Sequence, residues 1–153
     1  LRDRGIHVEI VPGVTSASAC AASIGVPLTH RGLATGVRFL TGHCREDMNL
    51  DFDWRGLADP DTTLVIYMGM ANIPQIVAKL LENGLDGGLP VAAIASGTTA
   101  RQRHIVSTLA GIVGDVRAAA LEGPVLFVIG RVVALADAAL ATSPVAAVEV
   151  RVG

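Results

Sequence analysis

The chain has 153 residues, a formal net charge of −2 at pH 7 and an aromatic content of 3%. This charge provides no basic field for nucleic acid, and so few aromatic side chains provide no stacking surface for single-stranded bases. Hydrophobic residues make up 51% of the chain and the mean hydropathy is +0.53. Gly, Pro or charge interrupts every apolar run before the ~18 residues that a membrane span needs. We therefore expect one domain with an aliphatic core and with neither nucleic acid nor membrane as a partner.

The cysteine content indicates the compartment of the protein, and the first residues indicate that the chain is part of a longer polypeptide. Cys20 and Cys44 cannot build a disulfide framework and no signal peptide precedes them, so a cytoplasmic location is expected. His43 stands beside Cys44, but adjacent residues on a strand point to opposite faces, so no metal site is predicted. The opening LRDRG is typical of a helix end with a Gly stop. We expect the chain to be a piece of a longer polypeptide.

In the first part of the chain, short apolar runs alternate with turn signals. Residues 7–11 have a β-type pattern that ends at a Pro-Gly turn. Thr15 is a good helix N-cap, and the small residues 17–24 predict a short helix stopped by glycine. Residues 37–41 predict a second strand. The polar, punctuated stretch 49–61 predicts a loop with at most one turn of helix.

In the later part, the clearest element is a helix over 72–83, because its apolar residues recur at helical spacing. Pro74 is tolerated in its first turn and Gly84 ends it. Short apolar runs predict strands, and a weaker helix is expected at 110–121. Together the elements predict an α/β fold with a mixed five- or six-stranded sheet and helices on both faces. The strands of this part are expected at 62–68, 91–95, 104–108 and 125–129, and after Pro144 a tail or an added edge begins.

The stretch 11–31, VPGVTSASACAASIGVPLTHR, carries the first candidate site. At Pro12-Gly13-Val14-Thr15-Ser16 a strand end meets a helix start, which presents free N–H groups and hydroxyls to a polar ligand group. An ordinary capped turn has the same pattern.

The second candidate site is Tyr67-Met68-Gly69-Met70, at the end of a buried apolar run. A methionine there places a soft side chain at a rim, and the glycine lets a ligand approach the backbone. Plain core packing would explain an isolated methionine equally well. Because it completes the YMG triplet, Met68 is the stronger candidate and Met70 the weaker one.

The third candidate site is the loop Gly97-Thr98-Thr99 with Arg101, Gln102 and Arg103. The glycine permits close approach, and two arginines separated by one residue could bind carboxylates with their forked guanidinium groups. A solvated basic loop is the alternative. No G-x-G-x-x-G follows a strand and no P-loop is present, so a self-contained nucleotide site is not predicted.

Taken in this order, VPGVTSASACAASIGVPLTHR, VIYMGM (65–70) and GTTARQRHIV (97–106) resemble the tetrapyrrole methylase superfamily, and within it uroporphyrinogen III C-methyltransferase. GTT-x-RQR, LTHR and VRFLTGH favour this branch. The resemblance implies that residues 1–137 are the C-terminal domain of a two-domain fold and that 138–153 are a tail. The N-terminal domain would be absent from this chain, and with it the catalytic acid or base.

The resemblance implies transfer of methyl groups from S-adenosylmethionine to C2 and C7 of uroporphyrinogen III, giving precorrin-2 for sirohaem and cobalamin synthesis. It implies a cytoplasmic homodimer without a metal. The isolated chain is expected to be inactive, because half of the site would be missing. The implied contacts to S-adenosylmethionine, which becomes S-adenosylhomocysteine when its methyl group is transferred, are Thr15, Ser16, Met68 and Gly97. The implied contacts to the eight substrate carboxylates are Arg31, Arg38, Arg101 and Arg103.

Other readings stay open. A later precorrin methyltransferase also acts on a polycarboxylate, so its substrate would need the same cationic partners. The low charge and the few aromatic residues disfavour an rRNA ribose methyltransferase, and diphthine synthase is a further branch of the superfamily. A non-catalytic dimerisation or ligand-binding fragment is the reading from another class.

Overall fold

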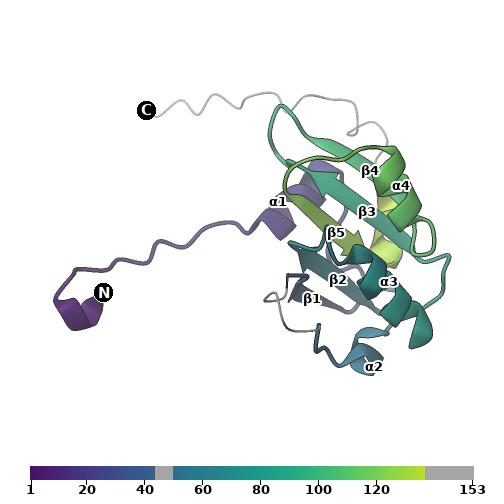
Figure 1. The fold of residues 1–153 in the computed structure, drawn as a ribbon, viewed down its shortest axis with the longest axis horizontal. Helices are drawn as coiled ribbons and strands as arrows, with labels where there is room; N and C mark the ends of the chain where they lie inside the picture. Colours follow the sequence, from purple (N-terminus) through teal and green to yellow (C-terminus); the bar gives the residue numbers. More distant parts are fainter. Residues whose placement is uncertain (44–49, 137–153) are drawn as a thin grey trace.

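The body of the molecule is built on one sheet of five strands (Figure 1). The computed structural model describes residues 1–43 and 50–136. The strand order is β1-β2-β5-β3-β4; β1 and β2 are parallel, and every other neighbouring pair is antiparallel. The predicted mixed α/β sheet is thus confirmed. The strands are β1 (Gly36–Thr41), β2 (Thr62–Tyr67), β3 (Pro90–Ala95), β4 (Arg103–Thr108) and β5 (Val125–Ile129).

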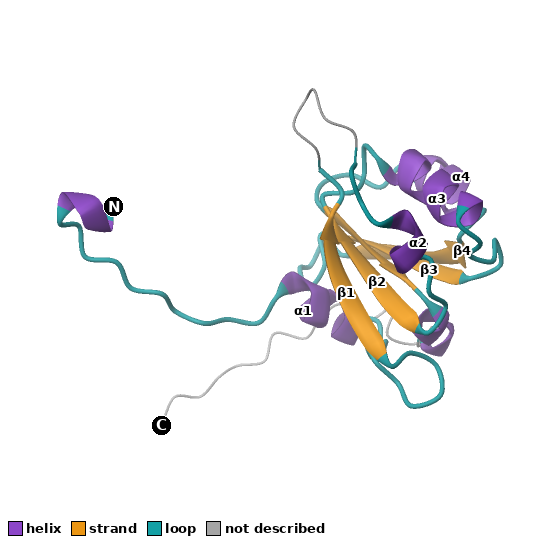
Figure 2. Ribbon diagram, turned by 90° about the horizontal axis from the view of Figure 1, so that it is seen from below, coloured by secondary structure: helices purple, strands orange, loops and turns teal. Residues whose placement is uncertain are grey.

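Helices cover both faces of the sheet (Figure 2). Successive side chains of a strand point to opposite faces. On β2, Leu64 and Ile66 therefore join the core beneath three helices, whereas Val65 joins the core on the other side. The first core is covered by α2 (Trp54–Leu57), α3 (Ile73–Glu82) and α4 (Ile112–Ala118); the second is covered by α1 (Ser16–Ser23) and the 3-10 helix η2 (Arg131–Leu135).

Helix α3 illustrates how local pattern produced the predicted elements. Its apolar residues at positions i, i+3, i+4 and i+7 are all buried, and Pro74 lies in its first turn. Gly84 follows with a φ of 100°, which glycine adopts readily and other residues do not. The predicted helix over 72–83 is confirmed to within one residue at each end. The residues that it buries are Ile73, Ile76, Val77 and Leu80.

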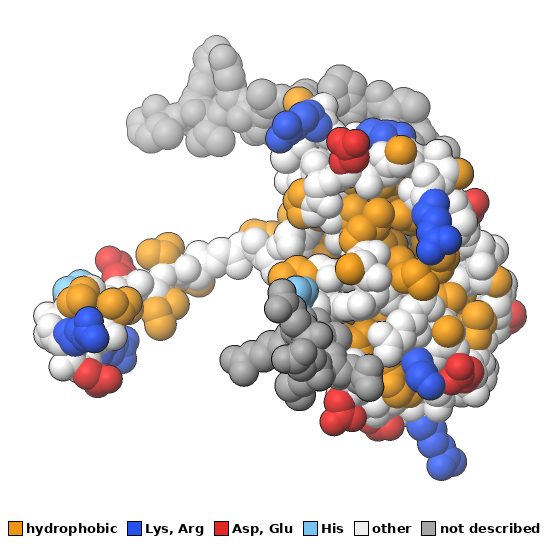
Figure 3. Space-filling model, in the orientation of Figure 1, with side chains coloured by type: hydrophobic (Ala, Val, Ile, Leu, Met, Phe, Trp, Pro, Cys, Tyr) orange, Lys and Arg blue, Asp and Glu red, His pale blue; other side chains and the backbone are white. Residues whose placement is uncertain are grey.

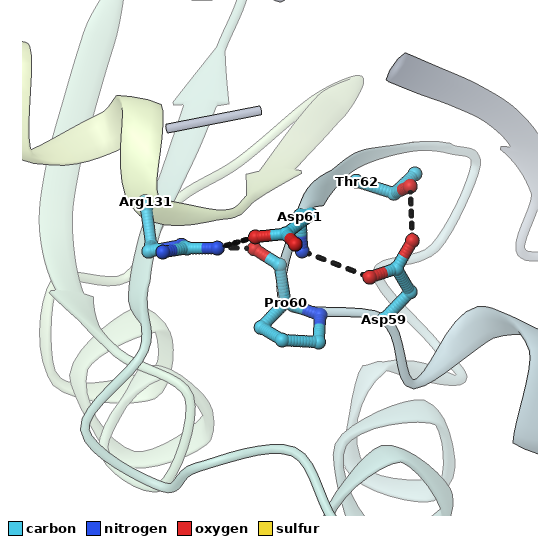
Figure 4. A network of polar contacts seen from close by, with 5 residues as sticks. All are labelled: Asp59, Pro60, Asp61, Thr62 and Arg131. Atoms are coloured by element: carbon cyan, nitrogen blue, oxygen red, sulfur yellow. Dashed lines mark hydrogen bonds and ion pairs between the residues drawn. The ribbon is translucent and has the colours of Figure 1, made fainter. Parts of the chain in front are cut away.

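A polar network fixes the turn that leads into β2 (Figure 4). The Asp59 carboxylate accepts a 2.6 Å hydrogen bond from the Thr62 hydroxyl and a 2.9 Å hydrogen bond from the Asp61 N–H. Arg131 donates from Nε to the Pro60 carbonyl at 3.0 Å and forms an ion pair with Asp61. These contacts tie η2 to the start of β2 across the end of the sheet opposite to the site described below.

The N-terminal segment differs from its prediction. Residues 6–14 form an extended arm that leaves the body at α1, not a strand, and the 3-10 helix η1 (Arg2–Arg4) lies at its far end (Figure 1). A strand needs a neighbour for its N–H and C=O groups, and the sheet offers this segment none in the described part of the chain. Hydrophobic side chains therefore lie open along the arm (Figure 3), including Ile10 and Val14, each 81% exposed.

None of the helices in the described residues is long and apolar enough to span a membrane. The predicted tail at 138–153 and the acidic residues Glu46 and Asp47 lie outside the described residues, as does Cys44.

Candidate functional site

Three of the sequence motifs meet at one end of the sheet. Because β3 runs antiparallel to both of its neighbours, its last residue, Ala95, pairs with the first residue of β4, Arg103, and with the first residue of β5, Val125. β2 is antiparallel to β5, so Tyr67 at its carboxyl end lies at this same end of the sheet. Residues about thirty positions apart in the chain are thus brought together by the strand order.

A cavity of about 340 Å³ opens at this end, within the range of small-molecule sites. We call it the Tyr67 pocket. Aliphatic side chains and a thiol line much of it, and serine and threonine hydroxyls supply polar groups. It is lined by Ser16, Cys20, Tyr67, Met68, Ile94, Ser96, Gly97, Thr99, Arg101, Pro124, Val125 and Leu126.

The N-terminus of α1 forms one wall of the pocket. Thr15 is the N-cap, as predicted, and its side-chain oxygen accepts a hydrogen bond from the Ala17 N–H at 3.4 Å. The Tyr67 hydroxyl accepts from the same N–H at 3.3 Å, and it is itself hydrogen-bonded to the Thr15 hydroxyl. The Ser16 side chain, one position further along, lines the cavity.

The turn after β2 places Met68 at the rim. Met68 is 63% exposed and has a φ of 51°, a left-handed conformation that is uncommon for residues other than glycine. The next residue, Gly69, packs against Gly42 so closely that a Cβ on Gly42 would lie 2.5 Å from the Gly69 Cα. Asn72 also donates to the Gly42 carbonyl at 2.7 Å. The turns after β1 and β2 therefore hold each other in place.

The loop between β3 and β4 is braced by its own side chains. Ser96 and Thr98 have φ angles of 48° and 63°. The Thr98 N–H donates to the Gln102 side-chain oxygen at 2.6 Å, and the Thr99 hydroxyl donates to the Ser96 carbonyl at 2.7 Å. Of the residues with left-handed backbone, Met68 and Ser96 line the pocket, and Thr98 lies in the loop between the lining residues Gly97 and Thr99. Such strain gathers where the surrounding structure holds the chain in a functional shape.

Gly97 is required here because of its neighbour. A Cβ on Gly97 would lie 2.3 Å from the Cys20 Sγ and 3.3 Å from the Cys20 Cβ. The glycine thus lets the loop approach α1 closely and form the floor of the pocket. Burial raises the pKa of the Cys20 thiol above its ordinary value.

The structure separates the two arginines of the loop. Arg101 lines the Tyr67 pocket, and its side chain has no hydrogen bond or ion pair with any described residue. The Arg103 guanidinium instead donates to the carbonyl oxygens of Ala119, at 2.9 Å, and Ala120, at 3.5 Å, just beyond α4. Both arginines line a second, more polar cavity of about 520 Å³, the Arg103 pocket, together with Ala95, Ser96, Ala120, Glu122, Gly123 and Pro124.

Two predicted substrate residues lie away from both pockets. Arg38 pairs with Leu64 across β1 and β2, so it faces the α2 side of the sheet, where its guanidinium donates to the Gly56 carbonyl at 2.8 Å. Arg31 is exposed in the turn that the His30–Ala34 bridge closes. Their assignment to the substrate stays a prediction.

Sequence reasoning missed some of the residues that build the pocket. Tyr67 stood inside the YMG triplet, but a tyrosine in an apolar run gives no local signal of the hydrogen bonds it makes. Gln102 stood in GTT-x-RQR, and its spacing of four residues from Thr98 was the available signal. Cys20 had none. In the described residues, no group of three His, Cys, Asp or Glu side chains is placed to hold a metal ion.

Comparison with known proteins identifies the family. A family model described as Tetrapyrrole (Corrin/Porphyrin) Methylases matches residues 1–113. The chain belongs to the tetrapyrrole methylase family. The predicted resemblance is confirmed, and the three motifs that meet around the Tyr67 pocket all lie within the matched residues.

Two curated relatives and one solved structure place the chain further within the tetrapyrrole methylases. The chain is 46% identical over 133 residues to the Uroporphyrinogen-III C-methyltransferase of Paracoccus denitrificans, covering 87% of this chain and 46% of the relative. It is 47% identical over 137 residues to the Siroheme synthase of Azotobacter vinelandii, covering 90% of this chain and 29% of the relative. The Uroporphyrin-III C-methyl transferase from Thermus thermophilus, solved with S-adenyl homocysteine, is 33% identical with a TM-score of 0.71 over 87% of this chain and 54% of that one. The chain thus spans about half of its relatives' length or less.

Proposed function

We propose that this tetrapyrrole methylase chain is the C-terminal half of a uroporphyrinogen III C-methyltransferase, which methylates C2 and C7 to give precorrin-2. The observation that carries the proposal is the convergence of three distant motifs on the Tyr67 pocket. Relatives at 46% identity bear this enzyme's name, and a relative of 33% identity was solved with S-adenyl homocysteine. Alternatives are a later precorrin methyltransferase and a non-catalytic dimerisation or ligand-binding fragment.

The pocket suits part of S-adenosylmethionine. Its aliphatic floor suits the apolar surface of the cofactor, while the hydroxyls and exposed backbone at its rim suit polar groups. When bound, the cofactor would supply a sulfonium methyl, whose carbon–sulfur bond breaks as a new bond to a pyrrole carbon forms. The residues of this chain would position it. We assign that role to Thr15, Ser16, Met68 and Gly97, and we assign no acid or base to this chain.

For the substrate, Arg101 is the arginine best placed to bind a carboxylate. It lines both pockets and its guanidinium has no partner among the described residues. Arg103 lines the Arg103 pocket beside Arg101 and keeps guanidinium donors that Ala119 and Ala120 leave open, so we assign it to a substrate carboxylate as well. Arg31 and Arg38 would act on carboxylates farther out on the substrate, and Arg38 would have to leave Gly56 to do so.

The proposal is tested with two proteins, this chain alone and a chimera in which it replaces the matching 133-residue region of the Paracoccus denitrificans relative. Titration with S-adenosylhomocysteine should show binding by the chimera and little or none by the chain alone. The chimera should methylate uroporphyrinogen III and the chain alone should not. Comparable binding by both proteins would contradict a site shared between two halves. Preferential methylation of a later precorrin would favour that alternative.

We also propose a homodimer for the complete enzyme. Hydrophobic residues make up 51% of the chain, and several large apolar side chains are exposed, among them Phe39 and Val106, each 50% exposed. Such surface suits an interface between subunits. Light scattering on the chimera should give the mass of a dimer, and a monomer mass would contradict the assembly.

A further inference from the structure

We propose that Tyr67 is a positioning residue, whose hydroxyl holds the N-terminus of α1 in the geometry that binds the cofactor. The inference rests on the proposed function and adds a residue to it. Tyr67 lies at the carboxyl end of β2, beside Met68, and it lines the pocket. Its ring is fixed from the β1 side by Phe39, with a centroid distance of 6.3 Å and an interplanar angle of 57°.

The hydroxyl of Tyr67 joins two parts of the site that are 50 residues apart in the chain. It accepts the Ala17 N–H at 3.3 Å and is hydrogen-bonded to the Thr15 hydroxyl. The N–H groups of a first helical turn have no partner within the helix, and they need one from outside. Here Thr15 and Tyr67 share the Ala17 N–H, at 3.4 and 3.3 Å. The start of α1 is therefore capped by β2 as well as by its own N-cap.

This arrangement couples three cofactor residues through one side chain. The β2 strand sets the position of Tyr67 and of Met68 after it. The Tyr67 hydroxyl then sets Thr15, and Ser16 follows directly as the first residue of α1. Without the hydroxyl, α1 would keep the cap from Thr15 but lose its connection to β2. We therefore expect weaker ligand binding with a largely intact fold.

The test is a double-mutant cycle in the chimera, read by titration with S-adenosylhomocysteine. Tyr67→Phe removes only the hydroxyl, and we expect the dissociation constant to rise about tenfold, as for the loss of one well-made hydrogen bond. Thr15→Val should raise it at least as much, because Thr15 also caps α1 and is assigned to the cofactor. The double variant should be little weaker than the more affected single variant, because both remove the same link. Thr15→Ser keeps the hydroxyl and should bind within about twofold of the unaltered chimera.

The matched control is Thr62→Val, which removes another hydroxyl hydrogen bond at the opposite end of β2. We expect it to lower the unfolding midpoint in urea at least as much as Tyr67→Phe does, without changing the dissociation constant. With methylation as the readout, Tyr67→Phe should raise KM for S-adenosylmethionine more than it lowers kcat.

The outcomes separate the inference from the proposed function. If the unaltered chimera does not bind S-adenosylhomocysteine, the proposed function is wrong and the inference is overturned with it. If the chimera binds but Tyr67→Phe binds equally well, the inference alone is overturned. Fully additive effects of Tyr67→Phe and Thr15→Val would also overturn it, because the two hydroxyls would then act independently.

Discussion

The substitution Gly97→Ala tests how the floor of the pocket is assembled. The new Cβ would lie 2.3 Å from the Cys20 Sγ, and 3.3 Å from both the Cys20 Cβ and the Ile94 Cγ2. Cys20 is 5% exposed and its thiol lines the Tyr67 pocket, so relief of the clash requires the sulfur to rotate into that cavity. Overpacking of this kind typically costs about 1–3 kcal/mol, and we expect about 2 kcal/mol here.

We expect Cys20→Ala to rescue Gly97→Ala. By itself, Cys20→Ala removes one buried atom and should cost about 1 kcal/mol. In the double variant the sulfur is absent, so the 2.3 Å clash does not occur. The total loss of unfolding free energy should then be about 1 kcal/mol instead of the additive sum of about 3 kcal/mol. Equilibrium unfolding in urea measures each free energy, provided that the slope is unchanged between variants.

Gly114→Ala is the matched glycine control. It lies in α4, where an added Cβ would meet nothing within 4 Å. Because glycine is a poor helix former, this change should stabilise the chain by up to about 1 kcal/mol. Additive costs in the Gly97 and Cys20 pair, to within about 0.5 kcal/mol, would refute the proposed steric contact.

Three other changes test separate parts of the fold. Asp59→Ala removes the carboxylate that accepts hydrogen bonds from the Thr62 hydroxyl and the Asp61 N–H, and it should lower the free energy of unfolding by about 1–2 kcal/mol. Urea unfolding measures this change, and an unchanged midpoint would contradict the network. Gly42→Ala places a Cβ against the backbone of Gly69, which cannot move aside, so its cost should reach at least about 2–3 kcal/mol, and a neutral result would show that these turns can separate. Burial lowers the pKa of His104 in the folded chain. The contribution of the neutral imidazole to stability is therefore complete above the ordinary histidine pKa, and it is lost as the pH falls through the lowered pKa of the folded chain. The free energy of unfolding should therefore fall less between pH 7 and pH 5 in His104→Leu than in the unaltered chain, whereas equal falls would count against this origin.

Elements with a complete local pattern were predictable from the sequence. Residues 125–129 were predicted as a strand and form β5 with those bounds, because an apolar run of that length needs cover on both faces. Thr15 was predictable as an N-cap because capping depends on the next two or three residues. The strand predicted at 7–11 was wrong, because local pattern alone does not make a strand. A strand also needs a partner, and the sheet offers none to this arm in the described residues.

The candidate site was predictable in part. Ser16, Met68, Gly97 and Arg101 were proposed from motifs, and the structure brings all four to the Tyr67 pocket. Their motifs contain glycine, a helix start or an exposed charge, each of which leaves a trace in the local sequence. The hydroxyl of Tyr67 left no such trace, since its partners lie 50 and 52 residues away.

By itself, therefore, the sequence determined the five strands of the sheet, most of the helices and the family of this chain, because these depend on periodicity, caps and short motifs. It did not reveal that residues 7–11 lack a strand partner or that η2 forms at Arg131–Leu135. Only the tertiary structure decided what the charged and polar side chains do. Arg101 and Arg103 are separated by one residue, yet the Arg101 guanidinium lines the pocket without a partner in residues 1–43 and 50–136, whereas the Arg103 guanidinium donates to the carbonyls beyond α4. The difference arises because β4 pairs beside β3 with α4 packed against it, and strand pairing between distant segments is not encoded in local pattern.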